Sequence, residues 1–292
     1  MPSLPVLKTM LREIITSERS PRVPEPDLIM DDPDKVAAYT RAGLEDGVMA
    51  PVYLFNCAQI CDVIRAGDTV VDLGCGPATQ LAMVARLNPE THFIGIDLSD
   101  DMLARAHAYL NKQGLTNVEL RRGDISRLSF LDDSSIDAVF STVAIHHLPD
   151  IASLDRTFTE IRRILKPSGG VYLVDFGHLK SEKSILQFAY QYADRQPELF
   201  TLDYLYSLRA AFQVTDFRRL TEQNLSNRAR VYANPIMPYM VAVKSAARGE
   251  VTSDLRNTFR RLRESLPAHH RTDISDLITL FRLGGLRSRL LT

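Results

Sequence analysis

The sequence predicts an α/β fold in which a mostly parallel β-sheet carries helices on both faces. Short apolar runs typical of buried strands alternate with stretches typical of helices, and this alternation indicates a parallel sheet. Two more strand-like runs follow late in the chain and predict an antiparallel pair. The strands are expected at residues 69–73, 93–96, 118–121, 138–141, 170–175, 228–233 and 239–245.

The residues before the first strand divide into an arm and two expected helices. Residues 4–16 carry apolar side chains at helical spacing, and residues 20–26 form a stiff proline-rich linker. We expect this arm, residues 1–33, to lie outside the core domain. Helices are expected at residues 34–42 and 51–64.

Composition describes an ordinary globular protein. Of the 292 residues, 45% are hydrophobic and 24% are charged, which suits one large domain with terminal additions. A formal net charge of -1 argues against a nucleic-acid partner. Cys57, Cys61 and Cys75 form neither a disulfide framework nor a paired zinc site, and no metal is expected. The first residues lack a signal-peptide core and no run reaches membrane-spanning length, so we expect a cytoplasmic protein.

The stretch Val70-Val71-Asp72-Leu73-Gly74-Cys75-Gly76-Pro77-Ala78 predicts a ligand-binding bend after the first strand. Gly74 and Gly76 allow a sharp turn and a close approach of the backbone to a ligand, and Pro77 suits the first turn of a helix. A dinucleotide fingerprint requires a third glycine where this chain has Thr79, which argues against NAD. The Asp72 carboxylate suits a cationic amine better than a pyrophosphate. S-adenosylmethionine carries such an amine and no phosphate.

This bend resembles the first motif of the class I S-adenosylmethionine-dependent methyltransferases, and the resemblance extends over about residues 34–246. Within the family the chain resembles small-molecule methyltransferases of the quinone-biosynthesis type. The resemblance implies a Rossmann-like, doubly wound sheet of seven strands that ends in an antiparallel hairpin. Four later segments match the family in order and spacing, at residues 93–99, 120–125, 136–150 and 165–175.

The resemblance assigns cofactor roles at the strand ends. Asp97 would bind the ribose hydroxyls, and an acid about twenty residues after a glycine turn is expected there in any βαβ unit. Leu98 and Met102 would lie near the adenine. Asp124 would bind the adenine amino group, while Ile125 packs on the ring. The remaining expected cofactor contacts are Tyr39 near the methionine end, Asp72, Gly74, Cys75 and Gly76 in the bend, and Thr142 at the end of the fourth strand.

His146 and His147 are the titratable groups expected nearest the reacting methyl group. Methyl transfer proceeds by in-line displacement, so the protein's main task is to position the nucleophile and exclude water. A base is needed only where the acceptor is a hydroxyl or a protonated amine. A structural or orienting role for the two histidines is therefore as open as a catalytic one.

Two helical additions complete the predicted organisation. Residues 179–225 are rich in aromatic side chains, and in similar enzymes an insertion here covers the substrate pocket. Residues 247–292 contain nine arginines, no lysine and five carboxylates, with apolar residues at helical spacing. This extension is expected to dock on its own domain or on a second copy in a homodimer; an acidic partner or a membrane surface is the alternative.

The sequence thus predicts an S-adenosylmethionine-dependent methyltransferase that yields S-adenosylhomocysteine and methylates an N, O or C atom of a small molecule. A non-catalytic S-adenosylmethionine-binding module and an NAD-dependent oxidoreductase are the alternatives.

Overall fold

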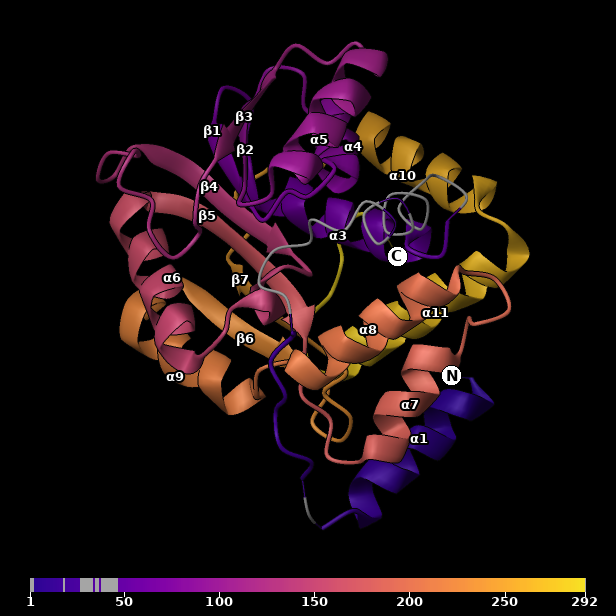
Figure 1. Ribbon diagram of the computed structural model, residues 1–292. Helices are drawn as coiled ribbons and strands as arrows, with labels where there is room; N and C mark the ends of the chain where they lie inside the picture. The colour runs from indigo at the N-terminus through magenta and orange to yellow at the C-terminus, as the bar shows by residue number, and fades with distance from the viewer. Residues whose placement is uncertain (1–2, 18, 27–33, 35–36, 38–46, 292) are drawn as a thin grey trace.

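The computed structural model describes residues 3–17, 19–26, 34, 37 and 47–291, and it contains the predicted seven-stranded sheet (Figure 1). The strand order is β3-β2-β1-β4-β5-β7-β6. The first five strands are parallel to one another, and β7 runs antiparallel to both β5 and β6. The doubly wound class with its terminal hairpin is therefore confirmed. The strands are β1 Thr69–Leu73, β2 His92–Asp97, β3 Val118–Arg122, β4 Ile136–Thr142, β5 Leu165–Phe176, β6 Ala229–Ala233 and β7 Met240–Ser245.

Each face of the sheet is covered by helices, because alternate strand residues point to opposite sides. Val70 and Phe93 belong to the buried cluster under α3, α4 and α5, whereas Val71 and Ile94 belong to the cluster under α6 and α9 (Figure 1). These helices are α3 Ala50–Val63, α4 Thr79–Leu87, α5 Asp100–Lys112, α6 Ile151–Ile164 and α9 Val214–Leu225.

Strand β5 differs from the expected helix, turn and short strand. Its pairing with β4 jumps from Ile136 opposite Leu165 to Ala138 opposite Gly170, so the expected turn residues form an outward bulge within the strand. A Cβ atom on Gly170 would lie 2.1 Å from the carbonyl oxygen of Val63. The glycine therefore permits the close approach of β5 to the end of α3.

The insertion predicted at 179–225 is helical, and two of its three helices lie on the side of the expected substrate pocket. Helices α7 Glu182–Tyr190 and α8 Glu198–Ala210 pack together, and α8 contacts the short 3-10 helix η1, Ile145–His147, after β4. Helix α9 instead packs against α6, β6 and β7.

The amino-terminal arm does not lie apart from the domain as we expected. Helix α1, Leu4–Ile15, packs on α7, and residues 19–26 then run along the domain towards η1 (Figure 1). We call residues 19–26 the strap. Its backbone is held where Ser20 N–H donates to the Lys180 carbonyl at 2.9 Å and Val23 N–H donates to the Arg209 carbonyl at 3.0 Å. Tyr39 and most of the expected helix 34–42 lie outside the described residues.

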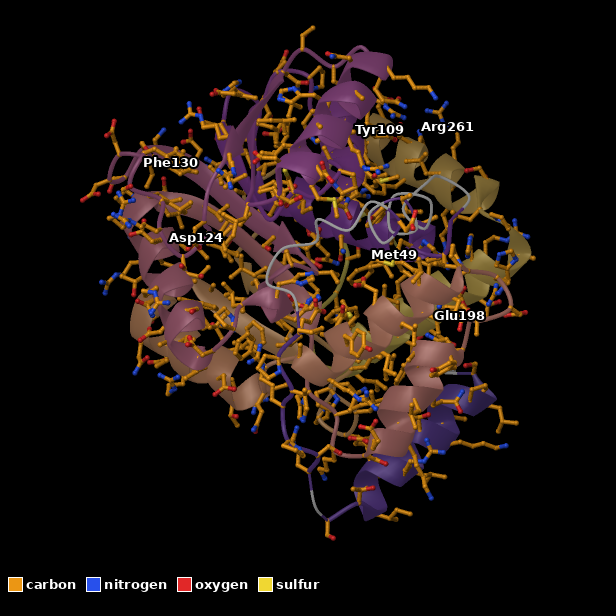
Figure 2. The ribbon with its side chains drawn as sticks, viewed as in Figure 1. Met49, Tyr109, Asp124, Phe130, Glu198 and Arg261 are labelled. Carbon is orange, nitrogen blue, oxygen red and sulfur yellow. The ribbon has the colours of Figure 1, made fainter. Side chains whose placement is uncertain are left out.

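The carboxy-terminal extension docks on its own domain. It contains α10 Ser253–Ser265 and α11 Ala268–Leu283, and both pack against α3. Phe281 of α11 stacks on Phe55 with ring centroids 5.0 Å apart. Arg261 on α10 lies exposed at the rim of the molecule (Figure 2). Among the described residues, no helix combines the length and the apolar character needed to cross a membrane.

Candidate cofactor and methyl-transfer site

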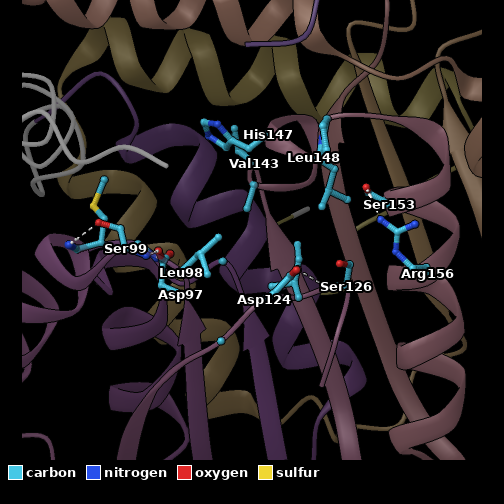
Figure 3. Close-up of a pocket in the computed structure, with 17 residues that line it drawn as sticks. Asp97, Leu98, Ser99, Asp124, Ser126, Val143, His147, Leu148, Ser153 and Arg156 are labelled. Carbon is cyan, nitrogen blue, oxygen red and sulfur yellow. Dashed lines mark hydrogen bonds between the residues drawn. The ribbon is translucent and has the colours of Figure 1, made fainter. Parts of the chain in front are cut away.

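A cavity of about 310 Å³ opens at the carboxyl ends of the central parallel strands (Figure 3). This edge is where open α/β sheets bind their ligands, because the strand order reverses there. Eight residues predicted from the sequence line the cavity: Gly74, Gly76, Asp97, Leu98, Met102, Asp124, Ile125 and His147. The other lining residues are Ser99, Gly123, Ser126, Val143, Ala144, Leu148, Pro149, Ser153 and Arg156.

The glycine bend forms the floor of this cavity. Gly74 has a φ of +75°, and a Cβ atom on it would lie 2.5 Å from the Cβ atom of Ala144. The N–H groups of Gly74 and Cys75 both donate to the carbonyl of Ile96, which ties the bend to β2. Helix α4 begins at Thr79, after Ala78 with a φ of 61°, so Pro77 lies in the turn and not in the first helical turn that we expected.

Asp97 ends β2 and joins that strand to the bend. Its Oδ2 atom accepts a hydrogen bond from Gly76 N–H at 2.8 Å, and its Oδ1 atom accepts one from Ser99 N–H at 2.9 Å. Burial raises the pKa of Asp97, and these N–H donors offset part of that effect. The carboxylate is therefore fixed at the rim of the cavity, where it could accept hydrogen bonds from ligand hydroxyls.

Asp72 is a buried acid with an unsatisfied oxygen. It is 1% exposed, and within the described part of the chain its Oδ1 atom has no hydrogen-bond partner. Burial, together with the nearby charge of Asp97, raises the pKa of Asp72 well above its ordinary value. Asp72 does not line the cavity, but its carboxylate lies in the strand that leads into the bend. An isolated buried carboxylate is costly, so a cationic ligand group beside it would be favourable.

Of the other predicted cofactor contacts, Asp124 lines the cavity, whereas two more do not. Asp124 lies exposed after β3, and its Oδ1 atom accepts a hydrogen bond from Ser126 N–H at 2.8 Å (Figure 3). Cys75 and Thr142 do not line the cavity. Cys75 is a buried free thiol whose pKa is raised by burial, and it packs near Gly95.

The two histidines of η1 have different partners. His146 is 2% exposed, its Nδ1 atom lies 2.7 Å from Oδ1 of Asp175, and its backbone N–H donates to Oδ2 of the same residue at 3.0 Å. His147 directs its Nδ1 atom to Oε2 of Glu25 at 2.7 Å. Glu25 belongs to the strap, so an acid more than a hundred positions away in the sequence reaches the candidate site.

The His147–Glu25 pair is an ion pair at neutral pH. Burial alone would lower the pKa of His147, but the hydrogen bond and charge of Glu25 prevail and raise it to about 9. Burial opposes ionisation of Glu25 as well, yet its contacts with His147 and His146 lower its pKa to about 2. His147 is consequently a hydrogen-bond donor at neutral pH and not a proton acceptor.

A second, smaller cavity of about 20 Å³ adjoins the first and shares Val143 and His147 with it. Aromatic and hydroxyl-bearing side chains form most of its wall. Its other lining residues are Met49, His146, Phe176, Phe200, Asp203, Tyr204 and Ser207. This chamber lies beyond the glycine bend, beside the histidines.

Glu25, His146 and His147 lie together, with a side-chain atom of each within 4.8 Å of the others. Sequence reasoning predicted the two histidines as site residues but not Glu25. Asp175 was also missed as a site residue, although its place at the carboxyl end of a parallel strand was a usable signal. Glu25 had no such signal.

Comparison with known proteins agrees with the fold. Residues 70–169 match the model of a methyltransferase domain. The chain is 36% identical over 113 residues to a sterol 24-C-methyltransferase of Pneumocystis carinii, which covers 37% of this chain and 28% of that protein. It is 34% identical over 113 residues to a demethylmenaquinone methyltransferase of Listeria welshimeri, which covers 38% of this chain and 46% of that protein. The matches thus span less than half of either relative.

A solved S-adenosylmethionine-dependent methyltransferase from Aquifex aeolicus shares the fold, with a TM-score of 0.53 at 19% identity over 75% of this chain and 100% of that chain. Residues 70–169 therefore carry a methyltransferase domain, and the fold around them is shared with a solved S-adenosylmethionine-dependent methyltransferase.

Proposed function

We propose that this protein transfers a methyl group from S-adenosylmethionine to an N, O or C atom of a small molecule. The observation that carries the proposal is the buried carboxylate of Asp72, whose Oδ1 atom has no hydrogen-bond partner among the described residues, behind a glycine bend to which Asp97 is hydrogen-bonded. Asp72 would face the cationic amine of the cofactor, and Asp97 would accept hydrogen bonds from its ribose hydroxyls. Leu98, Met102, Asp124 and Ile125 would hold the adenine. When bound, the cofactor supplies a methyl group that is already activated for displacement.

The protein's own contribution is to place the acceptor and to exclude water. Well-oriented reacting pairs reach effective molarities of ~10⁵ to 10⁸ M. The cavity of about 310 Å³ would hold the reacting groups, and the aromatic walls of the small chamber beside the histidines adjoin it. Where the acceptor must lose a proton, His146 is the better-placed base, because Asp175 holds its Nδ1 atom and its buried Nε2 atom, 3.6 Å from Oε1 of Glu25, makes no hydrogen bond among the described residues.

Two further parts of the proposal concern partners and location. Helix α1 presents the apolar side chains of Leu4, Leu7, Leu11 and Ile14 at its surface, which supports a homodimer formed through terminal helices. A cytoplasmic location is supported by three free cysteines, all of them buried. The small negative net charge supports a small-molecule acceptor over nucleic acid.

The test is incubation of the protein with cell extract and S-adenosylmethionine labelled in its methyl group, followed by identification of labelled products. We expect a labelled small molecule that is absent when Asp97→Ala replaces the wild type. Cofactor binding in calorimetry without any labelled product would favour the non-catalytic module. Thermal stabilisation by NAD but not by S-adenosylhomocysteine would favour the oxidoreductase.

A further inference from the structure

The strap brings an acidic side chain to the methyl-transfer end of the site. The Glu25 side chain is 7% exposed and makes two hydrogen bonds through its two oxygens. Its Oε2 atom lies 2.7 Å from Nδ1 of His147, and its Oε1 atom accepts a hydrogen bond from Ser207 Oγ of α8 at 2.8 Å. Glu25 thus links the strap, the η1 loop and the helix above the small chamber.

Arg22 fixes the strap to the same loop. Its guanidinium donates to the backbone carbonyls of Leu148 at 2.7 Å and Pro149 at 2.8 Å. It also donates to the carbonyls of His146 and Ala210 and lies 3.9 Å from the ring centroid of Phe212. An arginine donates in a planar, fixed geometry, so this many acceptors define its orientation closely. Three residues further along the chain, Glu25 is therefore held against the loop that carries His147.

The electrostatic surroundings of His147 are mainly acidic. Glu25 from the strap, Asp203 from α8 and Asp175 from β5 all act to keep it charged, and Asp97 from β2 also feels its charge. His146 is the neighbouring imidazole, with ring centroids 4.3 Å apart, and the Tyr204 hydroxyl belongs to the same chamber wall. Glu25 is the one of these acids whose contact with the ring of His147 is a direct hydrogen bond among the described residues.

We propose that Glu25 is a positioning residue of the active site, which holds the ring of His147 by its Nδ1 atom and leaves Nε2 to donate a hydrogen bond to the methyl acceptor. The role towards the acceptor rests on the proposed function. A fixed imidazolium there recognises an oxygen lone pair of the acceptor, and the strap becomes part of the catalytic unit. His147 orients the acceptor, while proton removal is left to another group.

The decisive measurement is an NMR titration of His147 in the full chain, with its signals assigned by their loss in His147→Gln. We expect the wild type to titrate at about 9. Glu25→Gln keeps the shape of the side chain and removes its charge, so His147 should then titrate at or below the ordinary value of 6.5. Glu25→Asp should restore part of the shift. The control is Glu182→Gln, which removes a carboxylate that pairs with Arg209 and should leave the titration unchanged.

A wild-type midpoint near 6.5, or a midpoint that Glu25→Gln does not move, overturns the proposal. If Glu25→Gln does not fold, the titration midpoint of His147 in the wild type still tests the proposal. Once a methyl acceptor is identified, kcat can be measured as a function of pH. In Glu25→Gln, kcat should begin to fall at a lower pH on the alkaline side, because His147 loses its proton earlier. An unchanged pH profile would contradict the positioning role. If the wild type transfers no methyl group, the proposed function fails, but the pairing of Glu25 with His147 is still tested, because the titration requires no turnover.

Discussion

Asp72 and Asp97 show how two acids at adjacent strand ends acquire different properties. Both are withdrawn from solvent, and burial raises the pKa of each. Asp97 receives two backbone N–H groups, whereas Oδ1 of Asp72 receives none from the described residues. Asp97 is therefore suited to neutral hydroxyls, and Asp72 to a positive charge that would compensate its burial.

Asp97→Ala should weaken cofactor binding, because each hydrogen bond to a charged group contributes ~1.5 to 3 kcal/mol. Calorimetry with S-adenosylhomocysteine measures the loss. Asp100→Ala is the matched control, since Asp100 begins α5, its side chain is 75% exposed and it forms a surface ion pair with Arg122 at 3.2 Å. Equal affinity of a folded Asp97→Ala protein and the wild type would contradict the assignment. Because burial raises the pKa of Asp97, affinity should also fall as the pH is lowered and this group becomes protonated.

At the scale of elements, the site depends on backbones that approach one another closely. The bend after β1 passes against the loop after β4, where Gly74 faces Ala144. The same principle acts in β5, where Gly170 lies against the end of α3. In both places the missing side chain permits a contact that sets the position of a neighbouring element.

Gly74→Ala should abolish cofactor binding and destabilise the fold for two reasons. The new methyl group would lie 2.5 Å from the Cβ atom of Ala144, and an alanine here would have to adopt a φ of +75°. Gly114→Ala separates these effects, since Gly114 has a φ of +65° with nothing within 4 Å of its Cβ position. The Gly114→Ala variant should lose only the ~1 to 2 kcal/mol of folding free energy that a positive φ costs an alanine. Its affinity for the cofactor should equal that of the wild type. Thermal denaturation and calorimetry on both variants provide the comparison; similar behaviour of the two would mean that the close approach is unimportant.

At the scale of the whole molecule, both ends of the chain are built into the domain. The strap reaches the candidate site, and α11 covers α3 through the stacked rings of Phe281 and Phe55. Arg248 at the start of the extension forms an ion pair with Asp68 at 2.8 Å and donates to the carbonyl of Val63. The extension should therefore unfold together with the domain.

Phe281→Ala should lower the free energy of unfolding of the whole chain by ~3 to 5 kcal/mol, the usual cost of removing a buried phenylalanine ring. Urea denaturation followed by both circular dichroism and intrinsic tyrosine fluorescence should show one shifted transition. Leu283→Ala, at a position 55% exposed on the same helix, should change stability by less than ~0.5 kcal/mol. A separate early transition of α11, with the main unfolding transition at the same urea concentration as in the wild type, would show that the extension folds separately.

The sequence by itself determined the parallel sheet, its closing hairpin and the glycine bend, because strand periodicity and turn chemistry act between near neighbours in the chain. Eight of the residues predicted for the site also line the cavity, while their roles stay predictions. Only the tertiary structure decided that Glu25 pairs with His147, that Asp175 holds His146 and that the strap reaches the site. These contacts join residues far apart in sequence, and an extended proline-rich segment carries no local signal for the distant carbonyls and histidine that it meets.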